Sequence, residues 1–320
     1  MLQALVSIAG RFVNEVSRFF ARRHATLAEI RSFAPPSAFA LQPLRRVVLT
    51  DGVSRTLFEE FATHHAEIGD ERETGWLLLG VRQEEEAVVL ATLPAGAQGD
   101  AGVGHVQFNS AGQVVASRIV RQTDKRLVVL GIVHTHPGSL RHPSDGDFRG
   151  DIDWVGQLKG REGIFGIGTA DSSPINGTVF AHQPKTHVQC LGKLRLTWYA
   201  LRAGDRDYRP LPVALTLGPD LARSLHAVWS TIEAHAERLD RLCRQQTGIT
   251  FEVTAGEKGP ALAALIPLAE PGQGIRVLLE GKVGRYYLVR NGEPVLADVR
   301  EARVDRAVYL LLAELAAERD

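Results

Sequence analysis

The sequence predicts an α/β domain followed by a smaller α+β domain. The chain has 320 residues, which is long for one average domain and indicates two. Hydrophobic residues make up 44% of it, which is enough to form a core in each domain. Strand-like apolar runs alternate with helical patterns up to about residue 204, and the pattern changes after that point. We therefore expect three segments, residues 1–44, 45–204 and 205–320.

The first segment, residues 1–44, is expected to hold an amphipathic helix and a proline-rich linker. Apolar residues recur at helical spacing, and charged residues interrupt them before a membrane span or a signal-peptide core is complete. The favoured interpretation is a helix that packs on its own domain or on a second copy of the chain in a homodimer. A helix lying on a membrane surface is the alternative. Pro35 and Pro36 cannot continue a helix, so residues 32–43 are predicted to be the linker.

The central segment, residues 45–204, mixes strands and helices in one domain. Helical patterns cover residues 55–65 and 111–125, and the runs around them favour β-structure. The expected strands are residues 47–49, 76–80, 87–93, 103–108, 127–134, 164–169 and 177–182. This mixture is the reason to expect an α/β domain.

The last segment, residues 205–320, predicts a small α+β domain. Apolar residues from Leu221 to Leu242 recur at helical spacing and predict one long amphipathic helix that ends at Gly248. Asn291-Gly292 is a strong signal for a hairpin turn. The expected strands are residues 250–253, 261–268, 275–280 and 285–290, and residues 304–317 are the expected closing helix. This segment shows no catalytic or ligand-binding pattern, so recognition of a substrate or a partner is its expected role.

Charge and cysteine content exclude several classes of function. Lys plus Arg number 37 and Asp plus Glu also number 37, so the chain has no overall basic field that would favour nucleic acid. Cys190 and Cys243 lie far apart and form neither a disulfide framework nor a paired-cysteine metal motif. We therefore expect a cytoplasmic protein without a membrane span and without a nucleic-acid partner.

The segment GIVHTHPGSLRHPSDGDF, residues 131–148, carries the residues that suggest chemistry. His134 and His136 end a predicted strand two positions apart, so their imidazoles point to the same face. Asp147 follows Ser144 by three positions at a predicted helix start. Two histidines and a carboxylate are three N/O ligands, which leaves a fourth position for water, as catalytic zinc requires. Ser-x-x-Asp is also close to a capping box, which is the structural alternative for Ser144 and Asp147.

A water activated by zinc needs a nearby proton acceptor that is not itself a ligand. Glu73 is the candidate, because it stands just before Gly75 and an apolar strand at the mouth of the predicted sheet. Without the histidines, Glu73 would be interpreted as an ordinary surface glutamate.

Two further interpretations concern the same loop. His142 is either a substitute ligand or, in better agreement with its short polar loop, a residue that is exposed to solvent or hydrogen-bonded to a ligand. A serine-hydrolase role for Ser144 is disfavoured, because the G-x-S-x-G motif of such enzymes is missing.

Together these residues resemble the motif of the JAMM, or MPN-plus, metallopeptidase family. That motif is a glutamate followed far downstream by His-x-His, seven residues, Ser, two residues and Asp. The matching positions here are Glu73, His134, His136, Ser144 and Asp147. The segment ETGWLLLG also resembles the first strand of the family, and the resemblance covers about residues 47–197. It implies a three-layer α/β domain of the cytidine-deaminase-like type, with a curved sheet between helices.

The resemblance also implies an activity. Members of the family cut isopeptide or peptide bonds after the C-terminal glycine of ubiquitin or ubiquitin-like proteins. Prokaryotic relatives trim sulfur-carrier-like proteins or act beside ubiquitin-like activating and conjugating enzymes. The expected partner is therefore a ubiquitin-like protein or its conjugate, together with such enzymes. A non-catalytic scaffold or a module that binds a ubiquitin-like protein is the alternative with the same fold.

The roles of the five residues follow from the resemblance. Zn²⁺ held by His134, His136 and Asp147 would lower the pKa of its water toward about 7, which makes a nucleophile available at neutral pH. Glu73 would be the general base that accepts the water proton. Ser144 would donate a hydrogen bond to the oxyanion of the tetrahedral intermediate.

Overall fold

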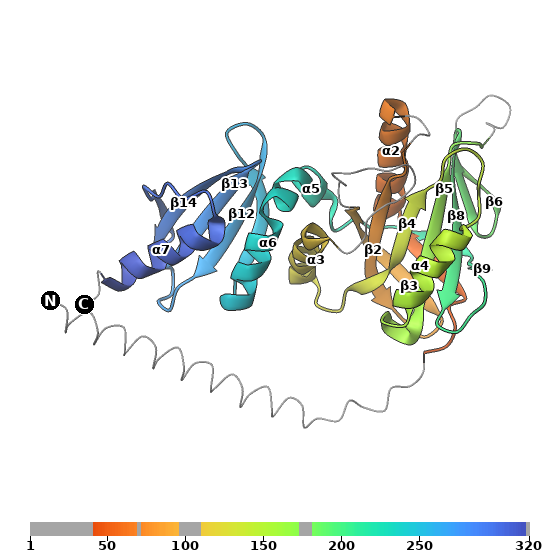
Figure 1. Ribbon diagram of the computed structural model, residues 1–320, viewed down its shortest axis with the longest axis horizontal. Coiled ribbons are helices and arrows are strands. Elements are labelled where there is room, and N and C mark those ends of the chain that lie inside the picture. The colour runs from red at the N-terminus through yellow and green to blue at the C-terminus, as the bar shows by residue number, and fades with distance from the viewer. Residues whose placement is uncertain (1–40, 69–71, 96–109, 173–180, 318–320) are drawn as a thin grey trace, which may run out of the picture. The chain divides into compact units, whose positions relative to one another are not determined.

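The structure is a computed structural model that describes residues 41–68, 72–95, 110–172 and 181–317 (Figure 1). Two compact units divide the chain after Ala40, and every element below belongs to the second unit, Leu41–Asp320. The expected N-terminal helix, most of the expected linker and the expected strand at residues 103–108 lie outside the described residues. None of the helices in the described ranges is both long and apolar enough to cross a membrane.

A ten-stranded mixed sheet forms the first part of this unit (Figure 1). Its strands follow the order β10-β1-β3-β2-β4-β5-β8-β7-β6, and β9 pairs with β8. Most neighbours are antiparallel, whereas β1 runs parallel to β3 and β10, and β4 runs parallel to β5. The strands are β1 (Arg46–Thr50), β2 (Gly75–Arg82), β3 (Glu86–Pro94), β4 (Val128–Thr135), β5 (Glu162–Thr169), β6 (Ala181–Lys185), β7 (Val188–Leu191), β8 (Leu194–Arg202), β9 (Arg209–Pro210) and β10 (Val213–Thr216).

This sheet curls until the two ends of its strand order meet. The backbone N–H of Val213, at the start of β10, donates to the carbonyl of Thr186, in the turn between β6 and β7 (2.8 Å). Both β9 and β10 come after residue 204 in the chain, and β10 is nevertheless a partner of β1. The curved sheet that the sequence predicts is therefore closed by residues that lie beyond the expected central segment.

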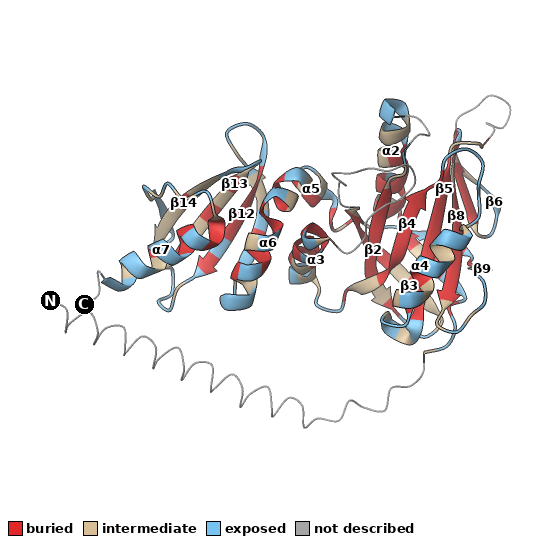
Figure 2. Cartoon of the chain, viewed as in Figure 1, coloured by how far each residue is buried: buried red, intermediate tan, exposed pale blue. Residues whose placement is uncertain are grey.

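Helices cover both faces of the curled sheet (Figure 2). On one face, α2 (Asp51–Ile68) packs into a core cluster that includes Leu78. On the other face, α3 (Ala111–Thr123) and residues of α4 (Asp145–Val155) pack into a second cluster that includes Leu77. Leu77 and Leu78 belong to different clusters because successive strand side chains point to opposite faces. The three-layer α/β arrangement with a curved sheet is thus confirmed.

The remainder of the unit is a five-stranded antiparallel sheet with helices packed against it. Helices α6 (Trp229–Gln245) and α7 (Val304–Ala317) contact this sheet, whereas α5 (Arg223–His226) contacts β3 of the first sheet. A short 3-10 helix, η1 (Lys159–Arg161), precedes β5 in the first sheet. The strands pair in chain order and are β11 (Thr250–Ala255), β12 (Pro260–Pro267), β13 (Gly274–Glu280), β14 (Val283–Arg290) and β15 (Glu293–Leu296). The Asn291-Gly292 hairpin is confirmed, because both residues have positive φ (54° and 84°) and Arg290 pairs with Glu293.

The single long helix expected from Leu221 to Gly248 is wrong. The chain instead forms α5 and α6, separated by a turn at Val228, whose φ of −116° and ψ of 17° leave the helical region. The α5 segment is held on the first sheet by hydrogen bonds, whereas α6 packs against α3. The apolar spacing fits one helix, but the first part of this segment binds the first sheet and the second part packs on α3. The chain therefore turns between the two parts.

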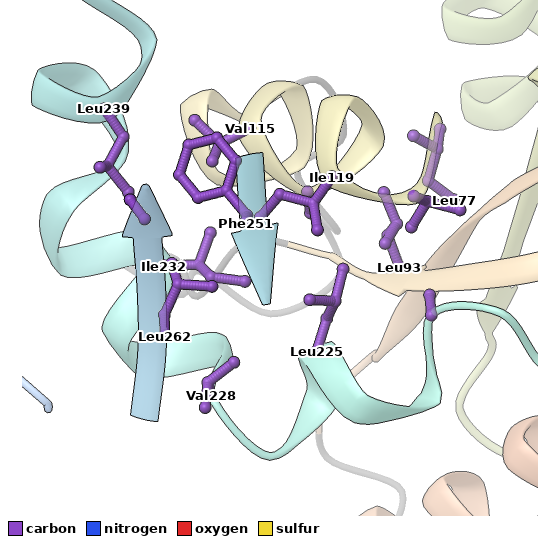
Figure 3. Packing of buried hydrophobic residues seen from close by; sticks show 14 of the residues in the cluster. Leu77, Leu93, Val115, Ile119, Leu225, Val228, Ile232, Leu239, Phe251 and Leu262 are labelled. Carbon is purple, nitrogen blue, oxygen red and sulfur yellow. The ribbon is translucent and has the colours of Figure 1, made fainter. Parts of the chain in front are cut away.

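One apolar cluster joins α3 to α6 and to the five-stranded sheet (Figure 3). Val115 and Ile119 of α3 lie close to Phe251 of β11, and Ile232 and Leu239 of α6 belong to the same cluster. All of them are buried. Removal of the chain after residue 204 would therefore expose the apolar side of α3 to water.

His226 connects α5 to the first sheet through both ring nitrogens. Its Nδ1 faces the carboxylate of Glu60 in α2, and its Nε2 faces the carbonyl of Thr92 in β3 (2.7 Å). Both partners can only accept hydrogen bonds, so the geometry requires a proton on each nitrogen. Burial acts to lower the pKa of His226, but Glu60, the Thr92 carbonyl and the charge of Asp220 outweigh it, so that the pKa is raised. Arg223, the other cation of α5 near this site, also pairs with Glu60.

We expect the stability that His226 contributes to fall as the pH rises. Its pKa is raised in the folded state, so the contribution is fully present below the ordinary value of about 6.5 and is lost as the pH rises through the raised value. The measurement is the free energy of unfolding of the wild type and His226→Gln at about pH 6 and about pH 9. The free energy of unfolding of the wild type should exceed that of His226→Gln by more at the lower pH, and the difference between the two pH values should be on the order of 1 kcal/mol. An equal difference at both pH values would contradict a doubly protonated His226.

Candidate metal centre

Strand β4 brings His134 and His136 together at its end. Both imidazoles are buried, with 5% and 6% of their residues' surfaces exposed, and their Nε2 atoms lie 2.9 Å apart. The Nδ1 atom of His136 lies 3.0 Å from the carbonyl oxygen of Leu140, so it carries the proton when the ring is neutral. This bond orients the ring and leaves Nε2 of His136 available as a ligand atom.

Helix α4 supplies the carboxylate of Asp147. Its Oδ1 lies 3.2 Å from Nε2 of His134, and its Oδ2 lies 3.2 Å from Nε2 of His136. Asp147 is also the N3 residue of a confirmed capping box, because its N–H donates to Oγ of Ser144 (3.2 Å) and its Oδ2 accepts from the N–H of Ser144 (2.6 Å). The Ser144 hydroxyl donates to the same Oδ2 (2.7 Å). The cap and the ligand role are therefore compatible, since the cap aims the carboxylate at the two histidines.

The three groups suit an ion with the coordination of zinc. His134, His136 and Asp147 each offer one ligand atom, and these atoms lie within 4.8 Å of one another. Two ligands on a tetrahedral zinc with bonds of about 2.0 Å would be about 3.3 Å apart. The separations of 2.9 Å and 3.2 Å are close to that value. Two imidazoles and one carboxylate are also a donor set that catalytic zinc sites use.

Electrostatics keep Asp147 ionised. Burial acts to raise the pKa of Asp147, but hydrogen bonds from His134 and His136 and the N-cap backbone of Ser144 outweigh it, so that the pKa lies well below its ordinary value. Burial likewise acts to lower the pKa of His136, but Asp147, the carbonyl of Leu140 and the charge of Glu73 raise it overall. The carboxylate is therefore ready to bind a cation at neutral pH, and a cation would replace the proton that the histidines otherwise attract.

Glu73 lies beside this group without joining it. It stands two residues before Gly75, which pairs with His134 across β2 and β4. Its side chain is half-buried, and its negative charge contributes to the raised pKa of His136. Within the described ranges, the only group that could hold a metal ion consists of His134, His136 and Asp147. Glu73 is thus close to the ligands and is not one of them, which is the position that a general base needs.

His142 also stays outside the ligand group. It is exposed, and its Nδ1 lies 2.8 Å from the hydroxyl of Tyr199 in β8. The same hydroxyl donates to the carbonyl of Arg141 (2.9 Å). These two contacts fasten the loop between His136 and Ser144 to β8, so the residue supports the loop.

Two residues near the centre escaped the sequence analysis, Asp151 and Thr135. Asp151 is buried one helical turn after Asp147 and accepts hydrogen bonds from the hydroxyl of Tyr208 (2.7 Å) and from Nε1 of Trp154 (3.1 Å). Burial raises the pKa of Asp151 to about 6. The four-residue spacing from Asp147 is the sequence signal that could have indicated it. Thr135 stands between the two histidines of the His-x-His motif, at the position where the motif specifies no residue type.

The fold and the site together define a three-layer α/β domain that carries a His-His-Asp group at the end of an internal strand. Residues 54–176 match the family model described as prokaryotic homologs of the JAB domain. All five positions of the sequence motif fall within this range. This part of the chain is therefore a JAB domain.

One solved structure is also similar to this chain. The solution structure of protein DSY2949 from Desulfitobacterium hafniense is 17% identical in sequence, with a TM-score of 0.37. The similarity covers 54% of this chain and 95% of that protein. No curated protein matches the chain.

Proposed function

We propose that the JAB domain is a zinc-dependent isopeptidase or peptidase that cleaves after the C-terminal glycine of a ubiquitin-like protein. The observation that carries this proposal is the convergence of His134, His136 and Asp147 beside Glu73, a carboxylate outside the ligand group. A non-catalytic scaffold or binding module with this fold would need neither three metal ligands nor a base. Experiments on the ligands and on Glu73 therefore separate the two functions.

Each residue of the site would have a distinct role in the reaction. Zinc bound by His134, His136 and Asp147 would act as a Lewis acid and would make a bound water more acidic. Glu73 would accept the proton of the attacking water and transfer it to the leaving nitrogen. Ser144 would stabilise the oxyanion by turning its hydroxyl from Asp147 toward the substrate. The N–H of Ser144 would still hold Asp147 while the hydroxyl is turned.

Burial of the ligands supports a slender substrate. The rings of His134 and His136 are almost completely covered, and the Asp147 side chain is 21% exposed. A chain segment that reaches them must bring its backbone close, which glycine allows because it has no side chain. The tail of a ubiquitin-like protein ends in glycine, and its folded body would bind a remote surface. We assign that surface to residues 205–320, and we assign neighbouring activating and conjugating enzymes as the source of the conjugates.

A tail exchange tests the substrate class. We expect a ubiquitin-like protein that ends in Gly-Gly, linked through its C-terminus to an aminocoumarin, to be cleaved at least about tenfold faster than the same protein ending in Leu-Leu. The reason is steric, because two isobutyl groups would have to enter beside buried histidines. The measurement is kcat/KM for the two substrates at equal zinc loading. Equal rates on both tails would refute selection for glycine.

A further inference from the structure

Thr135, between the two histidines, holds the segment that carries Glu73. Its hydroxyl oxygen accepts a hydrogen bond from the N–H of Thr74 (2.9 Å), and its own N–H donates to the carbonyl of Thr74 (2.8 Å). Thr74 is the residue next to Glu73. The side chain of Thr135 points away from the face that the neighbouring histidines share, and the residue is 4% exposed. One residue thus contacts the base segment while its two neighbours in the chain face Asp147.

The Thr135 hydroxyl is the partner that the structure gives to the N–H of Thr74. Regular pairing of β2 begins at Gly75, so Thr74 lies just outside the strand. Thr74 is half-buried, and a backbone N–H that is shielded from water needs a hydrogen-bond partner. Here a side chain takes the place of a strand neighbour. The hydrogen bond spans 61 positions of the chain and joins the start of β2 to the end of β4.

The orientation of Thr135 is fixed by its methyl group. The side chain is β-branched and therefore stiff about its first torsion angle. Gly168 of β5 makes room for it, because a Cβ at that position would come within 3.1 Å of Cγ2 of Thr135. The backbone of Gly168 also accepts a hydrogen bond from the N–H of His136 (2.8 Å). The side chain of Thr135 thus contacts β5 through its methyl group and Thr74 through its hydroxyl.

We propose that Thr135 is a positioning residue, which sets the distance between Glu73 and the metal ligands through its hydrogen bond to Thr74. This inference rests on the proposed function of Glu73 as the general base. A base works only within hydrogen-bond reach of the proton that it accepts, and a displacement of about 1 Å can lower a rate on the order of 100-fold. The hydroxyl of Thr135 is the feature of the His-x-His motif that supplies this control.

The test compares Thr135→Val with Thr135→Ser. Valine keeps the shape and loses the hydroxyl, whereas serine keeps the hydroxyl and loses the methyl group. We expect Thr135→Val to lower kcat on the aminocoumarin substrate ending in Gly-Gly by about 10- to 100-fold, with KM and zinc content unchanged. Thr135→Ser should restore kcat to within about threefold of the wild type. If Thr135→Val fails to fold, Thr135→Ala removes the same hydroxyl with a smaller side chain.

A second measurement does not need activity. In zinc-free protein, we expect the amide of Thr74 to exchange its hydrogen at least about tenfold faster in Thr135→Val than in the wild type and Thr135→Ser. Wild-type kcat in a zinc-loaded Thr135→Val protein would overturn the inference, as would equal losses in the valine and serine variants. If the wild type cleaves no substrate, the proposed function fails, and the exchange rates still decide whether the hydroxyl holds Thr74.

Discussion

Glu73→Gln is expected to abolish most hydrolysis while the protein keeps its zinc. The amide of glutamine preserves the shape of the side chain but cannot accept the proton of the attacking water, so kcat should fall on the order of 10² to 10⁴-fold. Zinc content should remain at the wild-type level, because Glu73 lies outside the group formed by His134, His136 and Asp147. The measurements are kcat on the Gly-Gly substrate and elemental analysis of the same preparation.

Glu67→Gln is the matched control for this variant. Glu67 is exposed in the last turn of α2, a few residues before Glu73. Its substitution makes the same change from a carboxylate to an amide. Its kcat should equal that of the wild type. A Glu73→Gln protein that is as active as Glu67→Gln would exclude Glu73 as the base, and a zinc-loaded wild type without activity would favour the scaffold.

Local patterns predict much of the site because its parts are local. The pair His134 and His136 follows from the two-residue period of a strand, and Ser144 with Asp147 follows from the signal for a helix start. Neither pattern indicates that the end of the strand lies next to the start of the helix. The resemblance to a known motif suggested this proximity, and the separations of 3.2 Å between the histidines and Asp147 agree with it.

The features that the sequence did not predict depend on partners far away in the chain. The turn at Val228 divides an apolar pattern that is continuous, because His226 is held by Glu60 and Thr92. The closure of the curved sheet depends on a hydrogen bond from Val213 to Thr186, and periodicity carries no information on such pairing. The contact made by Thr135 could not be predicted for the same reason. Threonine is common in strands, and nothing in the sequence indicates that its hydroxyl binds Thr74.

The second large effect is expected on the zinc content of the protein when a ligand is removed. The wild type should carry roughly one zinc per chain, because two imidazoles and a carboxylate converge on one point.

His136→Ala should lose nearly all of this zinc, since the variant removes a ligand atom that lies 2.9 Å from Nε2 of His134 and 3.2 Å from Asp147. Elemental analysis after dialysis against a weak chelator measures this, and His142→Ala is the matched control. His142 follows His136 in the same loop, but its ring contacts Tyr199, and it is not a member of the group found among the described residues, so its loss should leave the metal in place. Equal zinc in the wild type and His136→Ala would refute the site, whereas loss of zinc in His142→Ala would show that His142 is a ligand after all.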